Sequence, residues 1–343
     1  MGSVAKPNVC VFLKVDDLDK PILFARYDSH STDSLSSLSI GLLEQQKKSW
    51  PQLTNGYASL QGIRIREIVC DGFSVRLQFN PGRLVSSSAK VDAKSIAARK
   101  CFLCRENLPV EQQGVLYGTD TLILCNPAPI FNEHYTLSNT EHTPQSLRDR
   151  IPLFLNLAKD LAPHFSVFYN GPKCGASVPD HMHFQASPMN MMPIEMDVCD
   201  ATRRDRLRTA GSVALLRLQQ IGREVLVLES ANREDLAAEL AASITVMQRL
   251  ENVDEEPKIN VICSFTDGQW RVIIFPRSKH RPDVFFEEGE KKVMISPASV
   301  DIGGLVITPL EHDFHRVDAS LIESIYREVS VPEEFIHSIA DAL

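Results

Sequence analysis

The sequence of 343 residues has no excess of basic side chains, because 36 lysines and arginines stand against 44 aspartates and glutamates for a formal net charge of −8. Proteins that bind nucleic acid generally depend on a basic surface, so this balance argues against a nucleic-acid partner. It still allows a local basic pocket for a small anion, because net charge averages over the whole surface.

Long apolar runs and dense cysteines are also lacking. No run approaches the roughly 20 residues that a membrane-spanning helix needs. Lys14 and Asp16 cut short the first apolar stretch, and no small-residue cleavage site follows it, so we expect neither a membrane segment nor a signal peptide. Eight cysteines in a chain of this length do not resemble a disulfide scaffold. We therefore expect a protein of the reducing cytoplasm, with no membrane partner.

The composition is that of a folded protein, with 43% hydrophobic and 23% charged residues. The length suits two lobes of roughly 150 residues each. Alternating apolar patterns predict strands at Ile63–Cys70, Phe73–Phe79, Thr121–Cys125, His134–Ser138, Ser166–Tyr169, His181–Ala186, Glu224–Leu228, Lys258–Ser264 and Trp270–Phe275, and near Val293 and Leu305. Helical spacing predicts helices at Ser37–Lys48 (closed by Pro51), Gln145–Leu161, Arg203–Ile221 and Asn232–Leu250, and from Asp318 and Pro332.

A weak internal echo suggests how the chain is divided. Tyr135–His142 and Val272–His280 share one layout, a strand followed by a polar break and a histidine. We therefore predict an α+β protein with an N-terminal extension (1–60), a catalytic lobe (61–200) and a second, degenerate lobe (201–343). Each lobe is expected to carry an antiparallel sheet with packed helices.

The sharpest local motif is the run Asp180-His-Met-His-Phe-Gln-Ala. On a strand, His181, His183 and Gln185 point to one face, while the apolar residues between them point to the other and can anchor in a core. Incidental structural histidines on a half-exposed strand are the simpler alternative. The regular alternation after a glycine-containing loop favours a functional face.

A neutral imidazole on such a face is a competent nucleophile toward phosphorus. A covalent nucleotidyl-histidine splits one difficult displacement into two easier ones. Gln185 can donate an amide N–H to a phosphoryl oxygen but cannot supply a proton near neutral pH. This pattern favours transfer to a phosphate-bearing acceptor over acid-assisted hydrolysis.

The segment before the motif offers small residues, backbone N–H groups and a hydroxyl, as phosphate oxygens require. These candidate binding residues are Asn170, Gly171, Gly175, Ala176 and Ser177. Basic side chains that could offset substrate phosphates are Arg83 and Lys90, with Arg277 and Lys279 in the second half, although solvated surface charge is the default for each. Arg83 follows a rigid Asn-Pro-Gly turn that could aim it.

Cys101-x-x-Cys104 is the second motif, with the thiol spacing of half a tetrahedral zinc site. The candidate ligands to complete it are His142 and His181. A redox-active pair is disfavoured, because no thioredoxin-like βαβ pattern surrounds the two cysteines. Two free thiols are the remaining alternative. His134, which follows a proline-rich loop, can face the site or serve as a structural histidine.

Together these motifs resemble the histidine-triad superfamily, in the branch that contains galactose-1-phosphate uridylyltransferase, diadenosine tetraphosphate phosphorylase and GDP-L-galactose phosphorylase. That branch carries His-x-His-x-Gln, as His181, His183 and Gln185 stand here. The resemblance implies two histidine-triad-like lobes, the second degenerate, with His183 as the nucleophile, Gln185 steadying the nucleotidylated intermediate, and Asn170 and Ser177 touching phosphates. The Cys pair with His142 and His181 is similar to the uridylyltransferase zinc site.

The run from His181 to Ala186, followed by Pro193-Ile-Glu, is most similar to the GDP-hexose phosphorylases. The resemblance therefore implies a GDP-hexose and inorganic phosphate as substrates, with hexose 1-phosphate and a nucleoside diphosphate as products. A hexose-1-phosphate uridylyltransferase or a dinucleoside polyphosphate phosphorylase is the alternative within the same chemistry. A non-catalytic nucleotide-binding protein is the alternative outside it, and a homodimer is possible for any of these.

Overall fold

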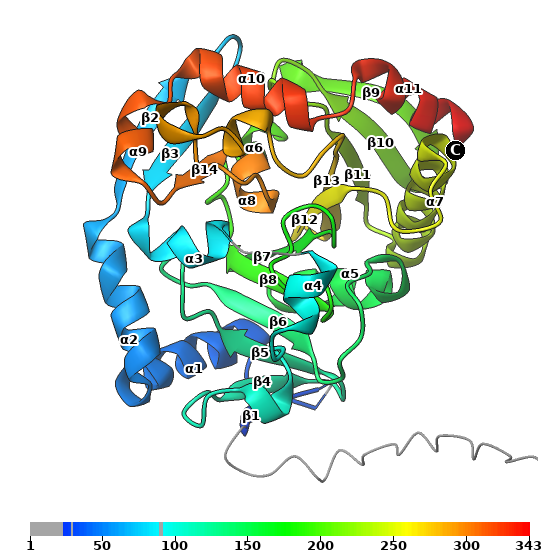
Figure 1. Ribbon diagram of the computed structural model, residues 1–343. Coiled ribbons are helices and arrows are strands. Elements are labelled where there is room, and N and C mark those ends of the chain that lie inside the picture. Colours follow the sequence, from blue (N-terminus) through cyan, green and yellow to red (C-terminus); the bar gives the residue numbers. More distant parts are fainter. Residues whose placement is uncertain (1–22, 29, 89–91) are drawn as a thin grey trace, which may run out of the picture.

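The computed structural model describes residues 23–28, 30–88 and 92–343, and Lys90 lies outside them. Most of the described chain is built on one sheet of 11 strands (Figure 1). Its strands are, in spatial order, β1 (Leu23–Tyr27), β4 (Gly114–Tyr117), β5 (Thr121–Cys125), β6 (Tyr135–Asn139), β8 (His183–Pro188), β7 (Phe165–Asn170), β12 (Ile259–Thr266), β13 (Gln269–Pro276), β11 (Leu226–Ser230), β10 (Val213–Leu218) and β9 (Arg204–Ala210). All neighbours pair antiparallel except β1 and β4. The first and second halves of the chain meet where β7 pairs with β12.

A second, three-stranded sheet joins distant parts of the sequence. It consists of β2 (Arg64–Val69), β3 (Ser74–Phe79) and β14 (Leu305–Thr308). The hairpin of β2 and β3 is antiparallel, whereas β14 runs parallel to β3, with Leu305 opposite Arg76. The early hairpin is therefore completed by a strand from near the C-terminus.

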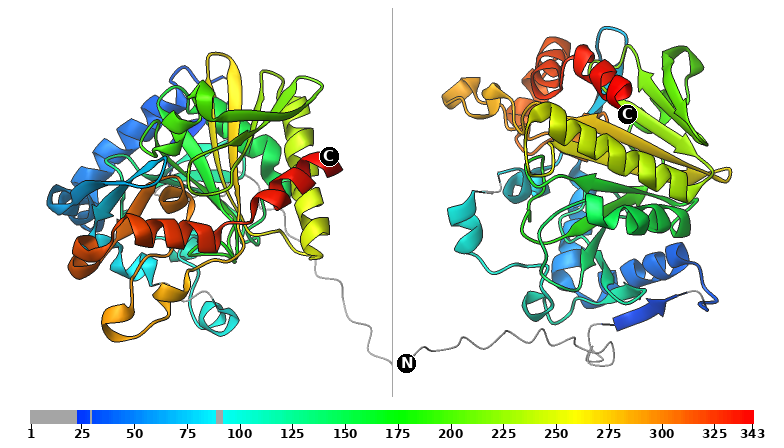
Figure 2. Two further views of the ribbon diagram at one scale, coloured as in Figure 1. Left: turned by 90° about the horizontal axis from the view of Figure 1, so that it is seen from above. Right: turned by 90° about the vertical axis from the view of Figure 1, so that its right-hand side faces the viewer.

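Two layers of helices cover the large sheet. One face carries α1 (Leu35–Ser49), α2 (Pro51–Ala58), α5 (Ile151–Asp160), α7 (Arg233–Glu251) and α11 (Glu333–Ala342), whose buried side chains share one hydrophobic cluster. Figure 2 shows α1, α5 and α7 side by side against this face. The other face carries the small sheet with α6 (Ile194–Asp197), α8 (Ser299–Ile302), α9 (Glu311–Arg316) and α10 (Ala319–Val329). Two short helices, α3 (Leu84–Ser87) and α4 (Ala93–Ala97), lie in the segment before the Cys pair.

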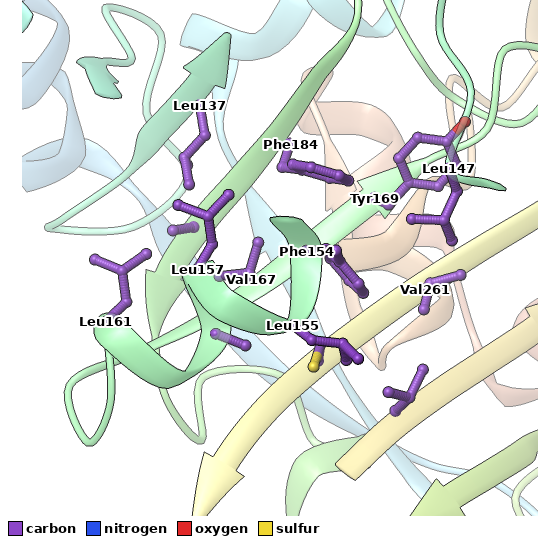
Figure 3. Close-up of a cluster of buried hydrophobic side chains, with 14 of the residues drawn as sticks. Leu137, Leu147, Phe154, Leu155, Leu157, Leu161, Val167, Tyr169, Phe184 and Val261 are labelled. Carbon is purple, nitrogen blue, oxygen red and sulfur yellow. The ribbon is translucent and has the colours of Figure 1, made fainter. Parts of the chain in front are cut away.

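The side chains of β8 alternate between these two layers. Phe184 enters the cluster under α5, where its ring centroid lies 4.9 Å from that of Phe154 and 5.9 Å from that of Tyr169 (Figure 3). Burial of such aromatic groups removes large apolar areas from water and fixes the strand in the sheet. His183 and Gln185, the neighbours of Phe184 in the strand, consequently face the opposite side of the sheet.

The predicted α+β class is confirmed, and most predicted strands lie within a few residues of their observed positions. The helix predicted at Arg203–Ile221 is wrong, because this segment forms the hairpin of β9 and β10 around Gly211, which has φ +55°. No strand forms near Val293 within the described residues, and the segment Gln145–Arg150 precedes α5 instead of belonging to it. The first predicted helix ends at Ser49 as α1, and Pro51 begins a second helix, α2. Proline suits the first helical turn, where no intrahelical N–H partner is needed.

No helix in the described part of the chain combines the length and apolar character that crossing a membrane requires.

Candidate active site

A cavity of about 310 Å³ lies on the face of the large sheet to which His183 and Gln185 point. Thr136 of β6 and Phe168 of β7 line it beside β8, because both stand in register with Gln185. The remaining wall comes from segments far apart in sequence, at residues 50–52, 83, 102–112, 124–130, 175–178, 280–281 and 296–307. The two halves of the chain thus share one cavity.

His183 presents one ring nitrogen to this cavity. Its Nδ1 lies 2.8 Å from the carbonyl oxygen of His181, and since a carbonyl only accepts, Nδ1 carries the proton. The lone pair is therefore on Nε2, the atom left for the cavity. Burial of the residue, which is only 4% exposed, is the main cause that lowers the pKa of His183 to about 4. The ring is therefore neutral, with an unshared electron pair on Nε2.

Gln145 holds the backbone of His183 and was not identified from the sequence. Its Oε1 accepts from the His183 N–H at 2.8 Å, and its Nε2 donates to the carbonyl oxygens of His183 at 2.9 Å and Asn170 at 3.0 Å. One buried amide thus ties the end of β7 to the start of β8. Gln145 lies in a loop without a motif, so no sequence pattern identifies it.

The orientation of Gln185 is set by His134, which is fully buried. The N–H of Ile130 donates to His134 Nδ1 at 3.2 Å, so Nδ1 carries no proton and the proton is on Nε2. That Nε2–H donates to Gln185 Oε1 at 2.8 Å. The carbonyl end of the amide is therefore occupied, and its two N–H donors are left for the cavity. Burial, with Arg83 nearby, lowers the pKa of His134 to about 3 and keeps the ring neutral.

The loop between β7 and β8 forms one wall, with Gly175, Ala176 and Ser177 lining the cavity. Gly175 has φ +96°, and a Cβ there would lie 2.6 Å from the Cβ of Ala298, so this position requires glycine. Gly171 is not among the residues that line the cavity in the described part of the chain. Its N–H donates to the carbonyl oxygen of Ile259 at 3.0 Å and anchors the loop to β12.

Asn170 lines the cavity, but its side-chain oxygen already has several donors. It accepts from Ser299 N and Ser299 Oγ, each at 2.8 Å, and from Asn260 Nδ2 at 3.0 Å. The Asn170 side chain, at the end of β7, thus connects the first half of the chain to β12 and α8 in the second half.

Two of the candidate basic residues do not line the cavity. Arg277 is fully buried and donates to carbonyl oxygens of Val329, Pro297, Lys279 and His280 and to Asn260 Oδ1. Lys279 pairs with acidic side chains outside the cavity. Their assignment to substrate phosphates is therefore wrong, and Arg277 instead satisfies the backbone of a turn.

Arg83 does line the cavity, together with Arg281 from the second half. Arg83 Nη1 donates to the carbonyl oxygen of Ala128 at 2.6 Å, and burial lowers its pKa to about 10, partly opposed by Asp301. The Asp301 carboxylate accepts the N–H groups of Ala298 and Ile307 at 3.0 and 2.9 Å. Burial raises the pKa of Asp301 to about 6.

Strand β8 begins at His183, two residues later than predicted, and His181 does not share the cavity face. Its Nδ1 instead lies 3.3 Å from Cys101 Sγ and 3.5 Å from Cys104 Sγ, while His142 Nδ1 lies 3.0 Å from Cys104 Sγ. The ligand atoms of these four residues are all within 4.8 Å of one another. The structure therefore brings together the four residues proposed from the sequence.

This cluster fits a tetrahedral metal ion. Bonds of about 2.3 Å to sulfur and about 2.0–2.1 Å to nitrogen place neighbouring ligand atoms roughly 3.3–3.8 Å apart, close to the three sulfur–nitrogen separations given above. His181 Nε2 donates to the carbonyl oxygen of Asn139 at 2.8 Å, which leaves Nδ1 as the ligand atom and fixes the ring. His142 Nε2 lies 3.7 Å from Asp180 Oδ2.

Comparisons with known proteins agree with this architecture. Residues 198–342 match the family model described as GDPGP1-like, C-terminal domain, and residues 42–188 match a domain of unknown function, DUF4922. A search of the curated proteins found no match. The chain's fold is similar to that of yeast Ap4A phosphorylase Apa2. The phosphorylase in the crystal structure with AMP has 19% sequence identity to this chain and a TM-score of 0.53, and the match covers 85% of this chain and 97% of that chain.

A second structure of the same yeast phosphorylase is 16% identical, with a TM-score of 0.56 over 84% of this chain and 97% of that chain. Its complex with Ap4A is also 16% identical, with a TM-score of 0.52 over 84% of this chain and 98% of that chain. At these identities the similarity concerns the fold, and it spans both halves of the chain.

Proposed function

We propose that the chain belongs to the branch of the histidine-triad superfamily that contains uridylyltransferases and dinucleoside polyphosphate and GDP-hexose phosphorylases, and that it transfers a nucleotidyl group through a covalent bond to His183. The observation that carries this proposal is the protonation pattern of His183. Its Nδ1 donates to a carbonyl, so the free electron pair is on Nε2, and His183 lines the cavity. A nucleophile in that state needs no base to activate it.

The reaction has two displacements. His183 Nε2 bonds to the α-phosphorus of a GDP-hexose, and the P–O bond to the distal phosphate breaks, so that its electron pair leaves with hexose 1-phosphate. An oxygen of inorganic phosphate then bonds to the same phosphorus, the N–P bond breaks, and its electron pair returns to Nε2. The second product is the nucleoside diphosphate.

Charge stabilisation comes from donors already in place. The Gln185 amide N–H groups are directed to the cavity, because the His134 Nε2–H occupies the amide oxygen. The loop with Gly175 and Ser177 adds backbone N–H groups and a hydroxyl, and Arg83 adds positive charge. Such prearranged donors are the main source of catalysis in phosphoryl chemistry.

The choice of a GDP-hexose rests on the motif from His181 to Ala186 and on the GDPGP1-like family of residues 198–342. Other nucleotide substrates of the same chemistry are outcomes of the experiment below.

We also propose that Cys101, Cys104, His142 and His181 hold a zinc ion with a structural role. Thiolate and imidazole donors in this number favour zinc, and four protein ligands leave no position for water. The ligand His181 supplies the carbonyl oxygen that accepts from His183 Nδ1. Through these residues the metal site would help to keep the nucleophile in its ring orientation.

The experiment uses the whole chain and a panel of nucleotide sugars and dinucleoside polyphosphates, without phosphate. Intact-protein mass spectrometry and peptide mapping should find a nucleotidyl adduct on His183, which disappears when inorganic phosphate is added. His183→Gln should form none, while His164→Gln, at an exposed histidine that is not among the residues lining the cavity, should form it normally. A non-catalytic nucleotide-binding protein would form no adduct with any member of the panel, and this outcome would overturn the proposal.

A further inference from the structure

The second half of the chain contributes a polar part of the cavity wall next to the glycine loop. The Pro297–Ala298 segment touches this loop, since a Cβ at Gly175 would lie 2.6 Å from the Ala298 Cβ and 3.5 Å from the Pro297 oxygen. His280, Arg281 and Ser296 line the cavity from the same side. The sequence echo predicts a degenerate second lobe, yet side chains from this half line the same cavity as His183.

The buried Arg277 fixes this wall. Its Nη1 donates to the carbonyl oxygen of Pro297 at 3.2 Å, and its Nη2 donates to those of Lys279 at 3.2 Å and His280 at 3.1 Å. One guanidinium thus fastens the turn at 277–281 to the segment beside the glycine loop. Groups on a turn held in this way are positioned before any ligand arrives.

Two side chains on this turn are suited to an anion. The Nε2 atom of His280 is buried and has no hydrogen-bond partner in the described part of the chain. Buried polar atoms of this kind are rare, because each forfeits the hydrogen bond that water would provide. Arg281 donates from Nε to Ser296 Oγ at 2.8 Å, and its guanidinium carbon lies 4.3 Å from the centre of the Phe285 ring, which holds it in place.

Charge favours this wall for a second phosphate. The arginines that line the cavity within the described residues are Arg83 and Arg281. Arg83 shares its neighbourhood with the Asp301 carboxylate and with His134, on the side of Gln185. Arg281 adds a second positive charge to the lining, on the turn that Arg277 fastens to the segment beside the glycine loop.

We propose that His280 and Arg281 form a phosphate subsite in the second half of the chain. It binds the distal phosphate of the substrate in the first displacement and the inorganic phosphate acceptor in the second. The His280 Nε2–H donates to a phosphate oxygen, and the Arg281 guanidinium offsets the charge. This inference rests on the proposed function, and it gives the second lobe a direct part in the reaction.

The experiment separates the two displacements. The nucleotidyl-protein is formed without phosphate and isolated, and then its decay is followed against the concentration of inorganic phosphate. Arg281→Gln and His280→Gln should each raise the half-saturating phosphate concentration about tenfold or more, the usual effect of losing a hydrogen bond to a charged group. Arg281→Lys, which keeps the charge, should fall between Arg281→Gln and the wild type.

The matched control is Lys279→Gln, which removes a neighbouring charge that pairs with Asp283 and Glu328 outside the cavity. Its phosphate dependence should equal that of the wild type. The affinity for a nucleoside monophosphate, measured by calorimetry with GMP, should also be unchanged in Arg281→Gln.

The outcomes distinguish this inference from the proposed function. If the wild type forms no adduct, the proposed function fails. If the adduct forms and Arg281→Gln, His280→Gln and the wild type share one phosphate dependence, the subsite is refuted while the nucleotidyl transfer stands. If Arg281→Gln weakens GMP as much as phosphate, Arg281 binds the nucleotide itself, and the subsite is likewise refuted.

Discussion

The contact between His134 and Gln185 leads to a quantitative prediction. His134 Nε2 donates to the Gln185 oxygen at 2.8 Å, so the amide N–H groups face the cavity. His134→Phe keeps an aromatic ring in the buried site but cannot donate this hydrogen bond. The Gln185 amide then turns freely, and in one of its two orientations the carbonyl oxygen meets the anionic phosphate and repels it.

The magnitudes follow from what each change removes. Gln185→Ala deletes a donor to the developing charge, which typically costs about 10²–10³-fold in rate. His134→Phe leaves the Gln185 amide in place but no longer fixes its orientation. The hydrogen bond that is lost is worth about 1 kcal/mol, which corresponds to a decrease in rate of about fivefold. His134→Phe should also lower the stability by about 1–3 kcal/mol, because it leaves the Ile130 N–H without its acceptor.

The assay is a double-mutant cycle on the rate of adduct formation in single turnovers. If His134 acts through Gln185, adding His134→Phe to Gln185→Ala should change the rate by less than about twofold, because no amide remains to be oriented. Urea denaturation should show that all four proteins are folded under the assay conditions. If the double mutant instead loses rate by the product of the two single-mutant factors, the reasoning is refuted and His134 has a role independent of Gln185.

Cys101→Ser should lose the bound zinc and the stability that zinc provides, as metal analysis and thermal denaturation can show, while Cys199→Ser, at an exposed thiol, should lose neither. Gly175→Ala should lower the free energy of unfolding by about 1–3 kcal/mol, because the residue has φ +96° and its Cβ would collide with Ala298; an unchanged urea midpoint would contradict the cavity wall described here. Burial raises the pKa of Glu256 to about 7 from an ordinary 4.5. Between these values the folded protein binds more protons than the unfolded chain, so this residue makes the wild type more stable as the pH falls from 8 to 5.5. Glu256→Gln should lack that increase in urea titrations at the two pH values, and equal changes in both proteins would contradict the burial effect.

Much of the site was predictable because its chemistry is local. Alternation along a strand places His183 and Gln185 on one face whatever the rest of the chain does, as long as Phe184 is drawn into a core. Two cysteines three positions apart favour a metal site in the same way, and the structure brings Cys101 and Cys104 together with the proposed histidines.

Short apolar runs were less informative. The residues from Arg203 to Ile221 fit a helical spacing, but they form the hairpin of β9 and β10. Gly211 was the available sign of a turn. Local sequence could not decide this, because pairing of β10 with β11 stabilises the extended form, and that pairing is a contact between separate segments.

The sequence by itself determined the class of fold, the strand that presents His183 and Gln185, and the thiol pair, since each depends on spacing between neighbouring residues. Only the tertiary structure decided which ring nitrogen of His183 is free, that His134 orients the Gln185 amide, and that Gln145 holds the strand of His183. It alone brought the turn at 277–281 to the cavity. The physical reason is that hydrogen bonds and packing between distant segments depend on how the chain closes on itself, and no periodicity in the sequence records that closure.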